Sequence, residues 1–471
     1  MKSIKRYNDK SYPIECSHVN EQQVISFFST FGELNLVRHW QSLNMDQRRS
    51  LESQVAQIDL PTLRLQQQLV QKKEDDIRRT FTPFESYSRC GNLEDVKRGK
   101  KALSQGLVGC LVVAGGQGTR LRINGPKGLC QVTAVRKKSL FQLLAEKTVA
   151  AGRQVGRLLP LAIMTSPLNH ADTVSFFEKH ALFGLDPSQL FFFSQDTLPL
   201  LDRQGHLFLE TADTLAMGPD GNGGVLHQFV RSGIWDQWQG AGVRHVNFVL
   251  IDNPLADPFD AELIGYQQRR TCDVVVKCTY RKTPEEKVGV VVQEHGKVAV
   301  VEYTELPYEE QKAMDANGSL RHLLANLSLF VFEMTFIKKI ANASIPLHKA
   351  FKAVKYLDGK GHTVQADHPM AWKFEKFIFD VLPLANQVEA LVYPREVCFA
   401  PLKNFSGDDS FDTVSRALQQ RDRQVLEAVT GMSCQTSAIE IAQDFYYPTE
   451  ALLTAWKGKQ VTQSCYMDPK I

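Results

Sequence analysis

The sequence predicts an α/β protein with a mainly parallel sheet, and two patterns carry this prediction. From residue 107 onward, short apolar runs of strand length alternate with longer amphipathic or mixed segments, as in α/β domains. The first run ends in a glycine-rich turn, and the ends of such strands are where an open α/β sheet binds ligands. The runs cover residues 107–114, 159–164, 190–193, 246–251, 274–278, 288–292, 298–301 and 327–332.

Length and composition are those of a globular protein. The chain has 471 residues, of which 43% are hydrophobic and 23% charged. Its 30 glycines and 20 prolines are far below the combined share of roughly 25–30% that marks low-complexity chains. Disorder, a collagen-like chain and a small disulfide scaffold are therefore excluded, and the length suggests about three domains.

The N-terminal region is expected to be helical. Apolar residues in Glu21–Phe31 recur at helical spacing, and a second helix is expected from a cap at Asn44 or Asp46 to Asp59. The stretch Gln66–Arg79 is polar and charged, so we expect it to be solvated.

These patterns divide the chain into three expected units. Residues 1–100 form a helical N-terminal region, residues 101–387 an α/β centre, and residues 388–471 a small C-terminal α+β unit. Within the centre, Lys373–Val381 is expected to form a helix. The basic segment His348–Lys355 is expected to be a solvated helix face.

Charge and cysteine content narrow the possible partners and compartment. With 55 Lys and Arg against 52 Asp and Glu, the formal charge is +3, which does not indicate a nucleic-acid or anionic-membrane partner. The nine cysteines are scattered and contain no C-x-x-C pair, which is typical of a reducing compartment. No apolar stretch follows the basic residues Met1–Lys10, so a secretory signal is not expected. We therefore expect a cytoplasmic protein without a membrane span.

The loop after the first apolar run has the composition of a phosphate-binding segment. It reads Gly115-Gly116-Gln117-Gly118-Thr119-Arg120, and Lys127 follows. Glycines let backbone N–H groups approach a phosphate or a base, and Arg and Lys bind phosphate oxygens. The loop lacks the G-x-x-x-x-G-K-[ST] pattern, and Leu121 stands where a dinucleotide fingerprint needs its third glycine. A bare tight turn with two solvated bases remains the alternative.

Residues 111–128, LVVAGGQGTRLRINGPKG, resemble the signature loop of the UDP-sugar pyrophosphorylases and are most similar to the UDP-N-acetylhexosamine pyrophosphorylase branch. The similarity continues in the same order over about residues 20–430. Two departures stand out: Arg122 occupies a position where the family usually has glycine, and the part beyond about 430 matches only vaguely. The further shared segments are Met164–Ser166, Gln195 with Pro199, Asp220–Gly224, Asp252–Asn253, Asp257–Pro258, Val301–Tyr303, Asn326, Lys373–Asp380 and Pro401–Asn404.

The resemblance implies a Rossmann-like nucleotide-diphospho-sugar transferase domain at 101–387. It also implies a uridylyltransferase reaction, in which UTP and N-acetylglucosamine 1-phosphate give UDP-N-acetylglucosamine and pyrophosphate with Mg²⁺ or Mn²⁺. At the nucleotide, it implies that Gly115, Gly116, Gln195 and Gly221 contact uracil or lie close to the nucleotide. Asp252 would lie beside the nucleotide and hold the metal ion. The alternative for Asp252 is a helix cap or a turn-forming residue before Pro254, and we favour the role at the metal ion.

The same resemblance implies which residues bind the phosphates and the sugar. Arg120 and Lys127 would bind the triphosphate, and Lys373 would neutralise charge at the α-phosphate. Lys403, from the C-terminal unit, would reach the sugar phosphate. Without the resemblance, each lysine is also readable as a solvated surface residue. The residues implied to recognise the sugar are Asn222, Glu302 and Asn326.

Three functions remain open at this point. The first is the N-acetylglucosamine enzyme, the second a UDP-glucose or broad-specificity UDP-sugar pyrophosphorylase, and the third an inactive sensor of UTP or UDP-sugar. The expected partners are UTP and a sugar 1-phosphate, with no nucleic acid or membrane, for a monomer or homodimer.

Overall fold

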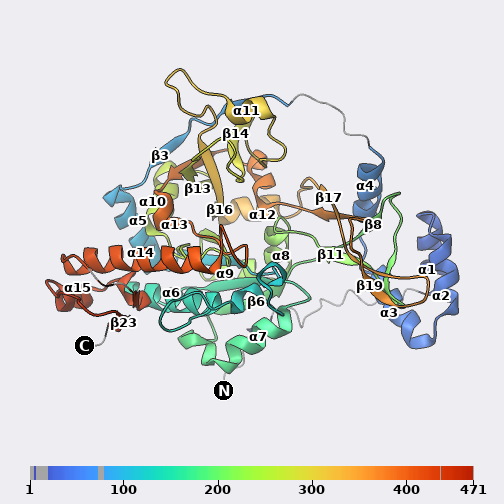
Figure 1. Cartoon of the computed structure of the whole chain (residues 1–471), viewed down its shortest axis with the longest axis horizontal. Coiled ribbons are helices and arrows are strands. Elements are labelled where there is room, and N and C mark those ends of the chain that lie inside the picture. The colour runs from blue at the N-terminus through green and yellow to red at the C-terminus, as the bar shows by residue number, and fades with distance from the viewer. Residues whose placement is uncertain (1–4, 7–19, 73–78, 435, 437, 470–471) are drawn as a thin grey trace.

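A twelve-stranded mixed sheet forms the centre of the molecule in a computed structural model that describes residues 5–6, 20–72, 79–434, 436 and 438–469 (Figure 1). Its main path runs β1-β6-β5-β4-β12-β16-β13-β21-β3, and every neighbouring pair on this path is parallel except those of β16. The predicted α/β fold with a mainly parallel sheet is confirmed. The strands are β1 Lys5–Arg6, β3 Tyr87–Arg89, β4 Val108–Val113, β5 Leu161–Thr165, β6 Leu190–Ser194, β12 His245–Leu250, β13 Val274–Tyr280, β16 Leu324–Glu333 and β21 Val388–Val392, with β2 Phe81–Pro83, β14 Val290–Glu294 and β15 Lys297–Val301 beside the path.

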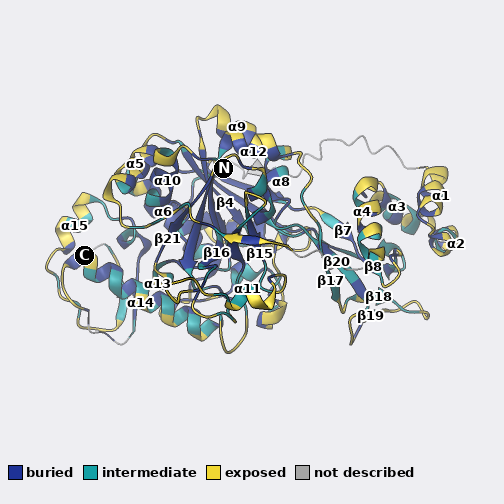
Figure 2. Cartoon of the chain, turned by 90° about the horizontal axis from the view of Figure 1, so that it is seen from above, coloured by how far each residue is buried: buried dark blue, intermediate teal, exposed yellow. Residues whose placement is uncertain are grey.

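The sheet separates two hydrophobic cores because successive side chains of a strand point to opposite faces. In β4, Val108, Cys110 and Val112 belong to one core and Leu111 to the other. Figure 2 shows the buried strands in dark blue between helices whose outer sides are exposed. The first core is covered by α5 Leu93–Ser104, α6 Leu140–Val155, α7 His170–Lys179, α10 Ala261–Arg270 and α14 Phe411–Thr430. The second is covered by α8 Val225–Arg231, α9 Ile234–Gly240 and α12 Met334–Ile340.

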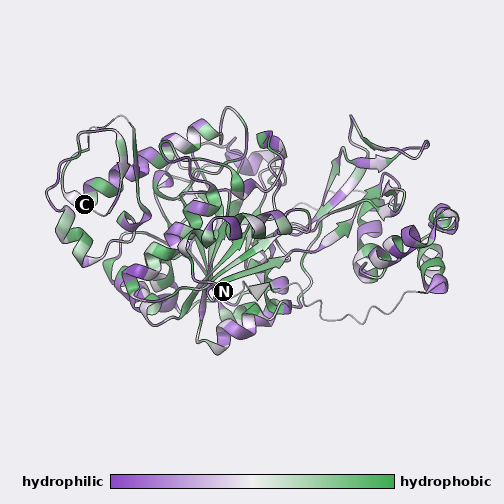
Figure 3. Ribbon diagram, turned by 90° about the horizontal axis from the view of Figure 1, so that it is seen from below, coloured by the Kyte–Doolittle hydropathy of each residue, from purple (hydrophilic) through white to green (hydrophobic). Residues whose placement is uncertain are grey.

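Four N-terminal helices form a separate lobe at the end of the molecule farthest from the C-terminal unit (Figure 3). They pack on apolar side chains of four short sheets and so share a third core with them. The helices are α1 Glu21–Thr30, α2 Leu34–Ser42, α3 Met45–Val55 and α4 Leu60–Gln71. The strands of this lobe are β7 Thr197–Pro199, β8 Leu201–Asp202, β9 Leu209–Thr211, β10 Thr214–Leu215, β11 Met217–Pro219, β17 His348–Lys352, β18 Lys355–Leu357, β19 Thr363–Gln365 and β20 Ala371–Glu375.

The caps of these helices settle one expectation and correct another. The Asn44 side chain accepts a hydrogen bond from Gln47 N at 3.0 Å, so Asn44 rather than Asp46 caps α3. Asp59 caps α4, and the expected solvated stretch from Gln66 begins inside that helix. The Gln66 side chain is fully buried and donates to the Pro199 carbonyl at 2.9 Å. A polar residue is accommodated here because its amide meets a backbone acceptor.

Two expected helices are strands. Lys373 lies in β20, which pairs antiparallel with β17 from His348 to Lys352, and residues 378–384 form a 3-10 helix. The buried residues Ala371, Phe374 and Ile378 recur at spacings of three and four, which imitates a helical face. Pairing between segments about 20 residues apart decides the structure, and such pairing is invisible to a local pattern.

The C-terminal unit contains α15 Glu450–Trp456 and a parallel pair of β22 Ile439–Ile441 and β23 Cys465–Met467, around a small core of its own. β21, just after the expected boundary at 388, lies within the large sheet, and the three units remain a prediction. Two shorter helices are α11 Tyr308–Lys312 and α13 Arg395–Cys398. Cys16 and most of Met1–Lys10 lie outside the described residues. Across the described ranges, no helix has the length and apolar character needed to cross a bilayer.

Candidate functional site

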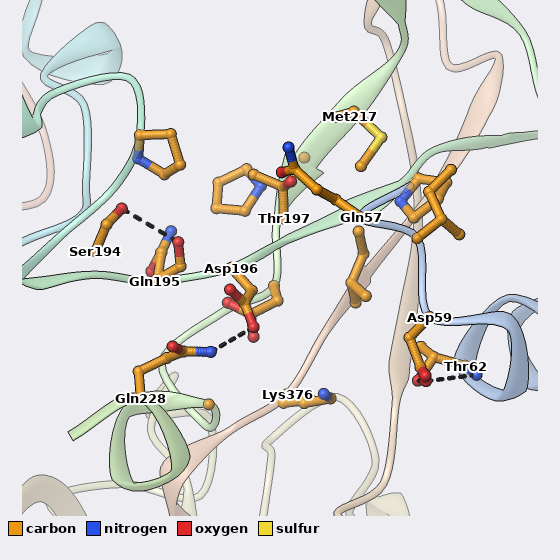
Figure 4. A pocket seen from close by; sticks show the side chains of 18 of the residues that line it. Gln57, Asp59, Thr62, Ser194, Gln195, Asp196, Thr197, Met217, Gln228 and Lys376 are labelled. Carbon is orange, nitrogen blue, oxygen red and sulfur yellow. Dashed lines mark hydrogen bonds between the residues drawn. The ribbon is translucent and has the colours of Figure 1, made fainter. Parts of the chain in front are cut away.

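A cleft of about 2010 Å³ lies between the N-terminal helices and loops of the central domain. In Figure 4, Gln195 and Asp196 lie on one side of it and Asp59 and Thr62 of the helical lobe on the other. Of the predicted site residues, Gln195 and Lys373 line this cleft. The other predicted residues lie outside its lining, so the site is better described by the contacts among the segments that carry them.

Gly115 and Gln195 meet at the carboxyl ends of β4 and β6. A Cβ atom placed on Gly115 would lie 2.9 Å from Gln195 Oε1, so a larger residue at 115 would push the amide away. The Gln195 side chain is nearly buried, and its backbone N–H donates to the Thr165 carbonyl at 2.9 Å. Parallel strands end at the same sheet edge, which brings these two residues together across 80 positions of sequence. Their predicted role at uracil remains a prediction.

The signature loop folds back on itself. The Gly116 carbonyl accepts from Lys127 N at 3.1 Å, and Gly118 N donates to the Gly125 carbonyl at 3.0 Å. Arg120 is exposed in the short 3-10 helix Thr119–Leu121, and among the described residues it has no ion-pair partner. An unpaired guanidinium on a folded glycine-rich loop is available to an anion.

Asn169 supports this loop and was not predicted. Its buried Nδ2 donates to the Ala114 carbonyl at 3.0 Å and lies 3.4 Å from the Gly116 carbonyl. In the sequence, Asn169 is recognisable only as an asparagine shortly after β5. This pattern is too common to assign a role.

Lys127 and Asp252 form an ion pair between two predicted site segments. Lys127 Nζ lies 3.4 Å from Asp252 Oδ2, and both side chains are mostly buried. The Asp252 carbonyl accepts from Leu402 N at 2.8 Å, next to Lys403. Asn253, whose role was also not predicted, donates to the Cys398 carbonyl and accepts from Ala400 N. The loop after β12 is thereby bound to the segment that carries Lys403.

Lys403 is fixed by Asp409. Its backbone N–H donates to the Asp409 carbonyl at 2.7 Å, and its ammonium lies 3.8 Å from Asp409 Oδ2. Burial raises the pKa of Asp409, and the charge of Lys403 opposes this shift. Nearby, Arg122 adopts a φ of 58° and its guanidinium lies over the Phe405 ring.

Gly221 and Asn222 are joined to the segment after β20. Gly221 has a φ of +88°, and a Cβ there would lie 2.4 Å from the Lys376 carbonyl oxygen, so only glycine fits. Asn222 Oδ1 accepts from Ile378 N at 2.9 Å. Its N–H₂ group has no hydrogen-bond partner among the described residues, so it can donate to a ligand. Lys373 Nζ donates to Glu375 Oε1 at 2.7 Å, on the same strand.

Glu302 and Asn326 lie around Gly289. A Cβ on Gly289 would lie 3.5 Å from Glu302 Oε1 and 3.9 Å from Asn326 Cβ. Burial raises the pKa of Glu302. Asn326 Oδ1 accepts from Ser328 N at 3.0 Å, and Ser328 has a φ of 52°, so Asn326 also has a structural role in its strand.

Asp257 is half-buried further along the loop after β12 that carries Asp252. It accepts hydrogen bonds from Tyr447 and from Phe259 N, and burial raises its pKa. Within the described part of the chain, no group of three or more His, Cys, Asp or Glu could hold a metal ion. Asp252 is a single carboxylate, and Mg²⁺ at phosphate sites commonly takes one or two carboxylates with the substrate phosphates as further ligands. Asp252 therefore fits a metal that arrives with a nucleotide.

The glycine-rich loop and several cations lie at the carboxyl ends of strands in a mainly parallel sheet. These features define an α/β protein suited to a phosphorylated ligand. Residues 63–454 match the family model of UTP–glucose-1-phosphate uridylyltransferase, and the chain therefore belongs to that family of uridylyltransferase enzymes. The predicted resemblance to UDP-sugar pyrophosphorylases is confirmed.

Named relatives cover most of the chain. A probable UDP-N-acetylglucosamine pyrophosphorylase of Schizosaccharomyces pombe is 30% identical, covering 92% of this chain and 97% of its own. The UDP-N-acetylhexosamine pyrophosphorylase-like protein 1 of Homo sapiens is 32% identical, covering 82% and 81%. A solved UDP-N-acetylglucosamine pyrophosphorylase of Trypanosoma brucei superposes with a TM-score of 0.76 at 25% identity, covering 92% and 94%. A putative one of Entamoeba histolytica gives 0.75 at 27% identity, covering 83% and 100%.

Proposed function

We propose that this enzyme joins UTP and N-acetylglucosamine 1-phosphate to give UDP-N-acetylglucosamine and pyrophosphate. The observation that carries the proposal is the meeting of loops from separate parts of the chain: the glycine-rich loop with Arg120 and Lys127, the Asp252 loop, and the Lys403 segment bonded to it. Relatives named for UDP-N-acetylglucosamine at about 30% identity over more than nine tenths of the chain support the choice of substrate.

The base is assigned to the edge formed by Gly115 and Gln195. The missing side chain at 115 gives a flat approach, and the Gln195 amide both donates and accepts, as the uracil edge requires. Gly221, whose positive φ keeps its backbone close to Lys376, lines the next part of the nucleotide. These contacts orient the α-phosphate toward the second substrate.

The reaction is an in-line displacement at the α-phosphorus. A phosphate oxygen of the sugar 1-phosphate forms the new bond to the α-phosphorus, while the bond from the α-phosphorus to the bridging oxygen breaks and pyrophosphate leaves with its electron pair. Arg120 and Lys127 bind the leaving pyrophosphate, Lys373 lies at the α-phosphate, and Lys403 holds the incoming phosphate. Catalysis is then positioning and charge neutralisation, with no covalent enzyme intermediate.

Asp252 would hold Mg²⁺ together with phosphate oxygens of UTP. When bound there, the ion neutralises phosphate charge. Lys127, 3.4 Å from the carboxylate, keeps the Asp252 side chain oriented toward the phosphate loop in the absence of nucleotide.

Glu302 and the free N–H₂ group of Asn222 are assigned to the sugar, with Asn326 beside them. Glu302 accepts from two hydroxyls when ionised, and an amide N–H₂ donates to an acetamido oxygen or a hydroxyl. The matched family model is described by glucose 1-phosphate, so UDP-glucose synthesis is the second candidate. An inactive sensor would have no need of four cations aimed at phosphates.

A cytoplasmic location completes the proposal, supported by cysteines that are free throughout the described residues. The direct test of activity is pyrophosphate release from UTP and N-acetylglucosamine 1-phosphate with Mg²⁺. Release at enzymatic rates supports the enzyme, and binding of UTP without release from either N-acetylglucosamine 1-phosphate or glucose 1-phosphate would leave only the sensor.

A further inference from the structure

We propose that His348 is a positioning residue for the sugar 1-phosphate, which as an imidazolium binds Glu305 and Asp380 and thereby fixes Glu302 in the sugar subsite. This inference rests on the proposed function, because that function assigns Glu302 to the sugar.

His348 bridges two carboxylates from different elements. Its Nε2 lies 3.0 Å from Asp380 Oδ2 and its Nδ1 lies 3.2 Å from Glu305 Oε1. The ring packs against Phe377, with centroids 4.6 Å apart. A neutral imidazole has one N–H, so only the imidazolium donates to both carboxylates at once.

The two carboxylates belong to different segments, and one of these segments carries Glu302. The Glu302 carbonyl accepts from Glu305 N at 2.9 Å and from Leu306 N at 3.1 Å, so Glu302 and Glu305 share one tight turn. Asp380 Oδ2 also accepts from Phe377 N at 3.2 Å, which fixes the start of the 3-10 helix. The imidazolium therefore joins the Glu302 turn to the segment that follows Lys373.

The charges facing His348 favour its protonated form. Burial opposes its charge, but hydrogen bonds to Asp380 and Glu305 outweigh burial and raise the pKa of His348 to about 9. Arg79 holds Glu305 from the outer side, with Nη1 3.4 Å from Oε2. Burial and the Glu305 charge raise the pKa of Glu302, whereas the charges of His348 and Lys403 lower it. Loss of the imidazolium would both free the turn and favour a protonated Glu302, which accepts fewer hydrogen bonds.

The test is steady-state kinetics of His348→Gln with each substrate varied in turn. We expect the KM for N-acetylglucosamine 1-phosphate to rise about tenfold, the effect of losing charge-assisted hydrogen bonds worth about 1.4 kcal/mol. The KM for UTP and kcat should stay within about twofold of wild type, because the nucleotide contacts are on other loops. His348→Arg keeps a cation that donates to two carboxylates and should recover most of the sugar KM.

His362→Gln is the matched control, since His362 is exposed and its ring nitrogen lies 3.8 Å from Asp358 Oδ2, on a hairpin outside the site. It should leave both KM values unchanged. If His348→Gln does not fold, Glu305→Gln removes the acceptor charge from one of the same bonds at a more exposed position and should raise the same KM about threefold. Unchanged KM values, or equal rises for both substrates, would overturn the inference while the wild type remains active. No release by the wild type with any sugar 1-phosphate would instead contradict the proposed function.

Discussion

The guanidinium of Arg122 lies 4.7 Å from the ring centroid of Phe405. Arg122 follows Arg120 on the signature loop, and Phe405 follows Lys403, so the contact joins two segments that carry predicted phosphate ligands. Arg122 also has a φ of 58°, in the left-handed region. The position where the resembled family usually has glycine thus keeps a glycine-type backbone, and this chain adds a side-chain contact across the site.

Replacement of Arg122 separates the backbone requirement from the side-chain contact. Both Arg122→Gly and Arg122→Ala lose the Phe405 contact, but only glycine adopts the left-handed conformation without a steric penalty. We expect Arg122→Gly to have the higher free energy of unfolding, by about 1 kcal/mol, in urea denaturation. An alanine variant as stable as the glycine variant would show that the loop changes conformation when the arginine is lost.

Lys373 and Lys376 lie close together and differ in predicted role. Lys373→Ala is expected to lower kcat by about 100-fold or more, because a charge aimed at the α-phosphate acts in the transition state, and Arg120→Ala should behave alike. Lys376→Ala should lower kcat by less than about fivefold, since its backbone and not its side chain holds Gly221. Near-normal kcat in Lys373→Ala, measured by single-turnover pyrophosphate release, would remove this lysine from the mechanism.

Asp252→Asn tests the metal assignment. Loss of the carboxylate charge should raise the Mg²⁺ concentration for half-maximal activity by about tenfold or more, because Mg²⁺ prefers charged oxygen ligands. Titration of Mg²⁺ at fixed UTP measures this shift. The same Mg²⁺ dependence in variant and wild type would assign Asp252 only the structural role of pairing with Lys127.

The raised pKa of His348 makes the free energy of unfolding depend on pH. Because this pKa is about 9 in the fold against an ordinary value of 6.5, the imidazolium stabilises the native state fully below about pH 6.5, and this contribution is lost as the pH rises through 9. The free energy of unfolding of wild type minus that of His348→Gln should therefore be largest near pH 6 and smallest above pH 9. A difference that is constant from pH 6 to 9.5 would contradict a charged His348. Asp380 and Glu305 raise this pKa against the effect of burial, and the charged groups nearest to them are Glu302, Arg79 and Lys403.

Most of the central sheet was predictable because most of its buried strands are short apolar runs, as Val108–Val113 illustrates. The segment 371–378 was not predictable, since Ala371, Phe374 and Ile378 have helical spacing and the pairing with β17 decides its conformation. The local sequence does not indicate which distant strand will pair with this segment.

The predicted site likewise has one part that the sequence indicates and another part that depends on the fold. The approach of Gly115 to Gln195 follows from parallel strands ending at one edge, so position in the chain is informative there. The parts played by Asn169, Asp409 and His348 depend on backbone groups and carboxylates that are brought near only by the fold. A lone Asn, Asp or His in the sequence has no pattern that would reveal this.

The central claim is that the chain transfers a uridylyl group from UTP to N-acetylglucosamine 1-phosphate. The most direct measurement is kcat/KM for pyrophosphate release with UTP and Mg²⁺, comparing N-acetylglucosamine 1-phosphate with glucose 1-phosphate. We expect a preference for the acetamido sugar of about tenfold or more, equivalent to about 1.4 kcal/mol in the transition state. A preference for glucose 1-phosphate, or no release with either sugar, would contradict it.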